Sequence, residues 1–133
     1  MLRYTGHATA PRAAAPVGIF DSGLGGLSVL RALHQYLPLA DMLYVADSGH
    51  APYGEKDTTE IIARSEYITD FLLTQGAQAI VIACNTASAL ALDVVREESD
   101  IPIIGVVEPG ARAALQITQT KKIGVIGTEA TVQ

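Results

Sequence analysis

Residues 17–26 have the sequence Val-Gly-Ile-Phe-Asp-Ser-Gly-Leu-Gly-Gly, an apolar run (residues 17–20) followed by a polar, glycine-rich turn. Such a run reads as a buried strand that leads into a helix. Similar apolar runs recur at residues 42–46, 79–83, 103–106 and 122–126. They are rich in valine and isoleucine and do not alternate with polar residues, which favours strands buried on both faces of a parallel sheet.

Amphipathic stretches lie between these runs. Leucines recur at three- or four-residue spacing over residues 27–37, and a second apolar stripe covers residues 61–72. Asp57, followed by Glu60 three residues later, predicts the start of the second helix, and Gly76 predicts its end. Residues 86–98 and 109–119 supply two more helices. The fold class is therefore α/β: an open parallel sheet with right-handed crossovers and helices on both faces.

The pattern divides the chain into three parts. Residues 1–15 have no continuous apolar segment and are expected to form a disordered extension. Residues 16–108 are expected to form a first α/β lobe that binds substrate, with Glu108-Pro109 as a junction. Residues 109–133 are expected to begin a second, incomplete lobe, because the sequence ends at Gln133, where another helix should start. A truncated chain is the preferred interpretation.

Composition narrows the class of function. The formal net charge of −5 and the lack of a Lys/Arg cluster argue against nucleic-acid binding. The longest apolar runs are too short to span a membrane. The single cysteine fits a reducing cytoplasm, and no cysteine/histidine array has zinc spacing. We expect a soluble, cytoplasmic, mildly acidic protein that binds no metal.

Small polar residues follow three of the predicted strands: Asp21-Ser22-Gly23, then Asp47-Ser48, then Cys84-Asn85-Thr86. In an open parallel sheet, ligands bind beyond the carboxyl ends of the strands. These three groups should therefore meet at one edge of the sheet and form a binding site.

Cys84 stands between an apolar run and a predicted helix. The helix dipole and nearby N–H groups would favour the thiolate, which could act as a base or a nucleophile. A free cysteine can equally be a small buried hydrophobe, and Asn85 and Thr86 can be ordinary helix caps.

Two other features have alternative interpretations. The glycines after Asp21 suggest dinucleotide binding, with Asp47 as a ribose ligand, but Ser28 occupies the place of the third glycine and the aspartate would repel a pyrophosphate. Pro52-Tyr53-Gly54 is either a plain turn or a rigid group near the mouth of the pocket, and His50 beside it is a weak candidate base.

Five segments together resemble the glutamate racemases, within the wider aspartate/glutamate racemase superfamily. They are Val-Gly-Ile-Phe-Asp-Ser-Gly-Leu-Gly-Gly at 17–26, Pro-Tyr-Gly-Glu-Lys at 52–56, Ala-Cys-Asn-Thr-Ala at 83–87, Gly-Val-Val-Glu-Pro-Gly at 105–110 and Ile-Gly-Val-Ile-Gly-Thr at 123–128. Each is weak alone, but five in the expected order make the match specific.

The resemblance implies two similar lobes with glutamate between them and no cofactor. It implies that Cys84 is one of two catalytic cysteines and that the substrate is bound by Asp21, Ser22, Tyr53, Gly54, Asn85 and Thr86. It also implies a role in peptidoglycan biosynthesis. Because the family's second cysteine lies beyond Gln133, we expect this chain alone to be inactive. The alternatives are a one-cysteine, decarboxylase-like relative and a glutamate-binding fragment without turnover. The sequence leaves a homo-oligomer open.

Overall fold

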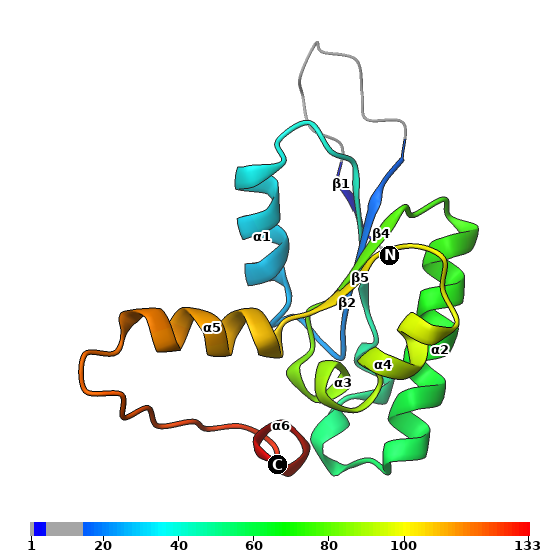
Figure 1. Ribbon diagram of the computed structural model, residues 1–133. Coiled ribbons are helices and arrows are strands. Elements are labelled where there is room, and N and C mark those ends of the chain that lie inside the picture. Colours follow the sequence, from blue (N-terminus) through cyan, green and yellow to red (C-terminus); the bar gives the residue numbers. More distant parts are fainter. Residues whose placement is uncertain (1, 5–14) are drawn as a thin grey trace.

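The computed structural model describes residues 2–4 and 15–133 (Figure 1). Its centre is a five-stranded sheet with the order β1-β3-β2-β4-β5. The strands are β1 (Leu2–Tyr4), β2 (Val17–Asp21), β3 (Met42–Ala46), β4 (Ala79–Ile82) and β5 (Ile103–Gly105). Strands β2 to β5 are parallel, while β1 pairs antiparallel with β3. The predicted open parallel sheet is confirmed.

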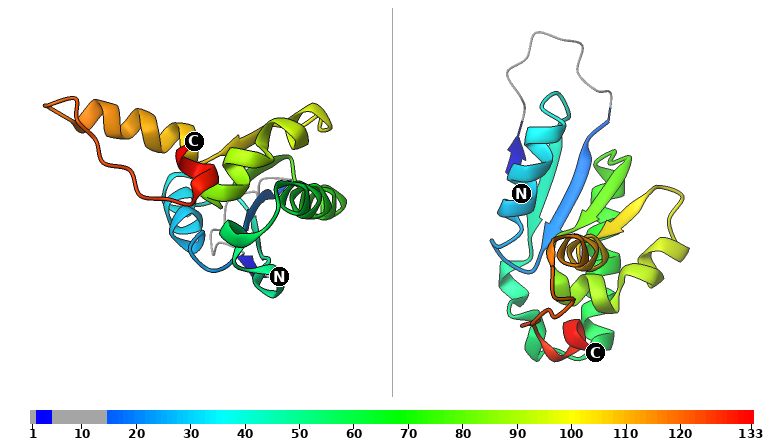
Figure 2. Two further views of the ribbon diagram at one scale, coloured as in Figure 1. Left: turned by 90° about the horizontal axis from the view of Figure 1, so that it is seen from below. Right: turned by 60° about the vertical axis from the view of Figure 1, so that its left-hand side comes forward.

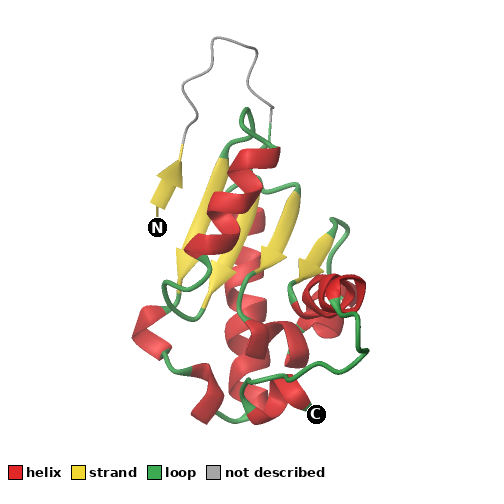
Figure 3. Cartoon of the chain, turned by 90° about the vertical axis from the view of Figure 1, so that its left-hand side faces the viewer, coloured by secondary structure: helices red, strands yellow, loops and turns green. Residues whose placement is uncertain are grey.

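The helices cover both faces of this sheet (Figure 3). They are α1 (Leu27–Tyr36), α2 (Thr58–Thr74), α3 (Asn85–Leu90), α4 (Leu92–Glu97), α5 (Val107–Ile117) and α6 (Glu129–Val132), with 3-10 turns η1 (Ser48–His50) and η2 (Tyr53–Glu55). Strands β3 and β4 lie on opposite sides of β2. Right-handed crossovers therefore place α1 on one face and α2 on the other. None of the described helices is both long and apolar enough to cross a membrane.

Successive strand residues point into two separate cores. Phe20 and Ile82 pack in the core on the side of α2, while Ile19 and Val81 pack in the core on the side of α1. Both faces of the central strands are thus buried, which explains why these strands are apolar without alternation.

The predicted strand at residues 122–126 is wrong. These residues have no regular structure, and Ile126 is fully exposed. A strand needs a neighbouring strand for its backbone hydrogen bonds, whereas α5 leads this segment away from the edge of the sheet at β5 (Figure 2). Residues 118–128 form an irregular segment, and α6 then packs beside α3. Helix α5 begins at Val107. Pro109 therefore lies in the first helical turn, where a missing N–H costs no hydrogen bond.

The structure also differs from the prediction at the N-terminus. Leu2–Tyr4 pairs with Met42–Tyr44 along the edge of β3, where a disordered extension was expected. A short segment can add to a sheet edge because the edge offers unpaired backbone groups. The rest of that predicted extension, apart from Ala15, lies outside the described residues. The division between lobes at residue 108 stays a prediction.

Candidate active site

The site lies where the order of the strands reverses. Strand β2 comes first in the sequence of these parallel strands, yet it sits between β3 and β4. The chain leaves β2 toward α1 on one face and leaves β4 toward α3 on the other face, so a crevice opens between the two strand ends. Asp21 ends β2, and Cys84 follows β4 directly before α3.

A cavity of about 990 Å³ occupies this crevice. Five of the predicted site residues line it: Asp21, Ser22, Cys84, Asn85 and Thr86. The remaining wall comes from the start of α1, from α5 and from the C-terminal segment, including residues Gly26, Val107, Gly110, Ile126, Thr128 and Thr131. The five predicted residues lie up to 65 positions apart in the sequence, and the whole wall includes residues from Asp21 to Val132.

Backbone N–H groups hold the carboxylate of Asp21. Ser22 donates its N–H to Oδ1 at 2.8 Å, and Gly26 donates its N–H to Oδ2 at 2.7 Å. Beneath the same turn, the hydroxyl of Tyr44 donates to the carbonyl of Gly23 at 3.0 Å. Burial, and then the charge of Asp21, raise the pKa of Tyr44 to about 12, so its phenol stays neutral.

Gly26 is needed for this arrangement. A Cβ atom there would lie 2.8 Å from both Ala83 Cβ and Tyr44 Oη, and 2.9 Å from Asp21 Cβ. We expect Gly26→Ala to lower the free energy of unfolding by about 1–3 kcal/mol, as overpacking does in tight cores. Urea denaturation measures this. Gly23→Ala is the matched control, because a Cβ at Gly23 meets no atom within 4 Å. Equal stability of the two variants would contradict the prediction.

Cys84 is the N-cap residue of α3 and is 6% exposed. Its Sγ lies 3.6 Å from Ser22 Oγ, to which the thiol donates. A cysteine that was only a core hydrophobe would pack among apolar side chains alone. Cys84 does adjoin the core, but it also lines the cavity beside a hydroxyl, so its sulfur can reach a bound molecule.

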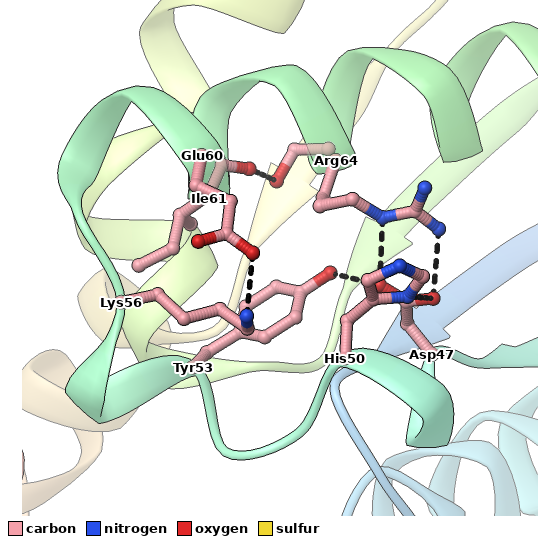
Figure 4. A network of polar contacts seen from close by, with 8 residues as sticks. Asp47, His50, Tyr53, Lys56, Glu60, Ile61 and Arg64 are labelled. Carbon is pink, nitrogen blue, oxygen red and sulfur yellow. Dashed lines mark hydrogen bonds and ion pairs between the residues drawn. The ribbon is translucent and has the colours of Figure 1, made fainter.

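Tyr53 and Gly54 do not line this cavity, in contrast to the other five predicted residues. Tyr53 is 2% exposed, and its hydroxyl donates to Asp47 Oδ2 at 2.7 Å (Figure 4). His50 also contacts Asp47, with Nδ1 3.0 Å from Oδ1. The expectation of a tyrosine at the mouth of the pocket is therefore not met in this structure: the ring is part of the core.

Sequence reasoning missed two threonines of the cavity wall. Thr128 Oγ1 lies 3.0 Å from Thr86 Oγ1 and 2.9 Å from Thr131 Oγ1. Thr128 is the N-cap residue of α6, which packs beside α3. The signal in the sequence was the Gly127-Thr128 pair before a short helical stretch, although nothing local connects it to Thr86.

Hydroxyl and amide groups dominate the polar wall. Asp21 is the one carboxylate among the described lining residues, which include no lysine, arginine or histidine. An anionic ligand would therefore be held by serine, threonine and asparagine side chains and by N–H groups. Within the described part of the chain, no three His, Cys, Asp or Glu side chains are close enough to share a metal ion.

The fold is that of a known enzyme family. The sequence profile of the Asp/Glu/hydantoin racemases matches residues 23–133, and the chain belongs to this family.

Within the family, the chain is similar to glutamate racemases. It is 52% identical to the glutamate racemase of Ralstonia pickettii over 92% of its own length and 43% of that enzyme's. The structure of the Aquifex pyrophilus glutamate racemase matches 87% of this chain, with a TM-score of 0.84 and 46% identity, over 46% of its own length. The Francisella tularensis glutamate racemase, solved with D-glutamate, matches 89% of this chain and 44% of its own, with a TM-score of 0.79 and 39% identity. The chain thus spans less than half the length of these relatives.

Proposed function

We propose that this chain forms one lobe of a cytoplasmic glutamate racemase that interconverts L- and D-glutamate without a cofactor and supplies D-glutamate for peptidoglycan. The position of Cys84 carries the proposal, because its sulfur lies 3.6 Å from Ser22 Oγ, in the wall of the cavity at the strand ends. The similarity to glutamate racemases supports the choice of substrate.

In the proposed reaction, the Cys84 thiolate takes the α-proton of glutamate. The C–H bond breaks, an S–H bond forms, and the electron pair stays on the α-carbon. An acid on the opposite face must then protonate this carbanion to invert the centre. The chain contains one cysteine, so we assign the second acid to a second lobe that faces this cavity.

The polar wall supports glutamate as the ligand. Its carboxylates would accept hydrogen bonds from the hydroxyls of Ser22 and Thr86 and from N–H groups at the start of α3, which has no side-chain cap. The ammonium group would lie toward the carboxylate of Asp21. Since N–H groups already bind both oxygens of that carboxylate, Asp21 is better suited to orienting charge than to taking a proton.

Proton NMR of the α-hydrogen in D₂O, started separately from each enantiomer, tests this function. The chain alone should show no racemisation and at most slow exchange in one enantiomer, because its base occupies one face. Adding the unmatched remainder of the Ralstonia pickettii enzyme, in trans or fused, should restore interconversion. A reconstituted protein that binds glutamate but never exchanges the α-proton would refute racemisation and support a binding role.

A further inference from the structure

The cluster of polar side chains around Asp47 lies outside the cavity. Each carboxylate oxygen of Asp47 makes two polar contacts (Figure 4). Oδ1 contacts Arg64 Nη2 at 2.8 Å and His50 Nδ1 at 3.0 Å, while Oδ2 accepts from Arg64 Nε at 3.0 Å and from Tyr53 Oη at 2.7 Å. These groups come from the end of β3, from the loop over residues 47–56 and from α2, so one carboxylate joins three parts of the fold.

Asp47 and Arg64 both stay charged in this cluster. Asp47 is 8% exposed, and burial alone would raise its pKa. Hydrogen bonds from Arg64, Tyr53 and His50 outweigh burial, and the pKa of Asp47 lies below its ordinary value. The bond to Asp47 likewise raises the pKa of Arg64. The carboxylate and the guanidinium therefore stay ionised at neutral pH, and the bidentate geometry fixes their orientation.

A chain of contacts leads from this cluster to the cavity wall. Gly54 follows Tyr53 directly and lies against the methyl group of Thr128, so close that a Cβ at position 54 would come within 2.7 Å of Thr128 Cγ2. The hydroxyl of Thr128 in turn lies 3.0 Å from that of Thr86, beside the cavity. On its other side, Asp47 donates its backbone N–H to the carbonyl of Asp21 at 2.9 Å.

We propose that Asp47 is a positioning residue for the candidate active site: it fixes Tyr53, and thereby sets the place of Gly54, Thr128 and Thr86. Asp47 does not line the cavity, and it acts through the loop. If Asp47 acted only locally, it would fix the loop over residues 47–56 but would not affect the positions of Thr86 and Thr128. The consequence for glutamate rests on the proposed function, but the positioning itself is measurable without any ligand.

NMR of the whole chain with ¹³C-methyl threonine tests the proposal. In the parent, the Thr128 methyl group should show a nuclear Overhauser effect to Gly54 Hα. In Asp47→Asn, which keeps the shape of the side chain but removes its charge, this cross-peak should be lost or strongly weakened, and the Thr86 methyl resonance should move. Tyr53→Phe removes a single hydroxyl and should have the same effect in a smaller degree. If Asp47→Asn does not fold, Tyr53→Phe serves as the test variant in its place.

Arg112→Gln is the matched control, because it breaks an exposed pair within α5, in which Arg112 Nε and Nη2 both donate to Glu108 Oε1. It should leave both threonine signals in place. Unchanged Thr128 and Thr86 signals in folded Asp47→Asn and Tyr53→Phe would overturn the proposal, even if the loop itself shifted. A glutamate titration of the reconstituted two-lobe protein separates the two proposals: absence of binding would count against the proposed function, while the methyl signals would still decide the role of Asp47.

Discussion

Replacement of Cys84 by alanine should abolish glutamate racemisation in the reconstituted two-lobe protein. Cys84 is the only thiol in this chain, and both oxygens of Asp21, the one carboxylate in the described cavity wall, already accept N–H groups. Loss of the base on one face should lower kcat by about 10²–10⁴-fold, the range typical for general acid–base groups. Circular dichroism follows inversion, and α-proton exchange in D₂O follows proton removal.

A control must show that Cys84→Ala leaves the cavity able to bind glutamate. Cys84→Ala removes one buried sulfur and should still bind glutamate, which amide chemical shifts report. Bound glutamate without proton exchange places Cys84 in the chemical step. If Cys84→Ala racemises at the parental rate, another group is the base and the proposed mechanism is wrong.

Replacement of Asp47 by alanine should have the largest effect on stability. It leaves the Arg64 guanidinium without its carboxylate and the buried Tyr53 hydroxyl without an acceptor. We expect the free energy of unfolding to fall by about 2–4 kcal/mol, because an unsatisfied buried hydroxyl costs about 1–3 kcal/mol and the partly exposed Arg64 also loses its charged hydrogen bonds. Urea denaturation at pH 7 measures the difference. Glu108→Gln breaks an exposed pair and should change stability by less than about 0.5 kcal/mol.

The contribution of Asp47 to the free energy of unfolding should depend on pH. The pKa of Asp47 is lower in the folded chain than in the unfolded chain, so its stabilisation is complete above its ordinary pKa of about 3.9 and is lost as the pH falls through the lowered value. The gap in stability between the parent and Asp47→Ala should therefore narrow in acid. A gap that stayed constant from neutral pH to about pH 2 would rule out the carboxylate charge as its source.

Much of the fold was predictable because the central strands are buried on both faces. Residues 42–46 and 79–83 read as continuous apolar runs and form β3 and β4 almost to the residue. Residues 122–126 read in the same way and form no strand, since a strand also depends on a neighbour that no local pattern shows. The three residues of β1 are too few for any periodicity to reveal.

For the site, the rule that ligands bind at strand ends was enough to group Asp21, Ser22 and Cys84. It could not place Tyr53, because the direction of that side chain is set by Asp47 and by Arg64, which lies 17 residues from Asp47 along the sequence. The alternative of dinucleotide binding gave Asp47 a ligand role, whereas its carboxylate binds Arg64 and Tyr53. These hydrogen bonds join residues that are apart in the sequence, so no local sequence pattern predicts them.

The central position of β2 has a consequence for biosynthesis. Its partners are made later than β2 itself, and β4 is completed only at Ile82, about 60 residues after Asp21. At about 5–20 residues per second, the ribosome needs on the order of 3–12 s for this interval. During that time, the apolar segment Val17–Asp21 has at most one of its two sheet neighbours. Until β4 is synthesised, the nascent chain therefore exposes an apolar segment that chaperones can bind and that can aggregate.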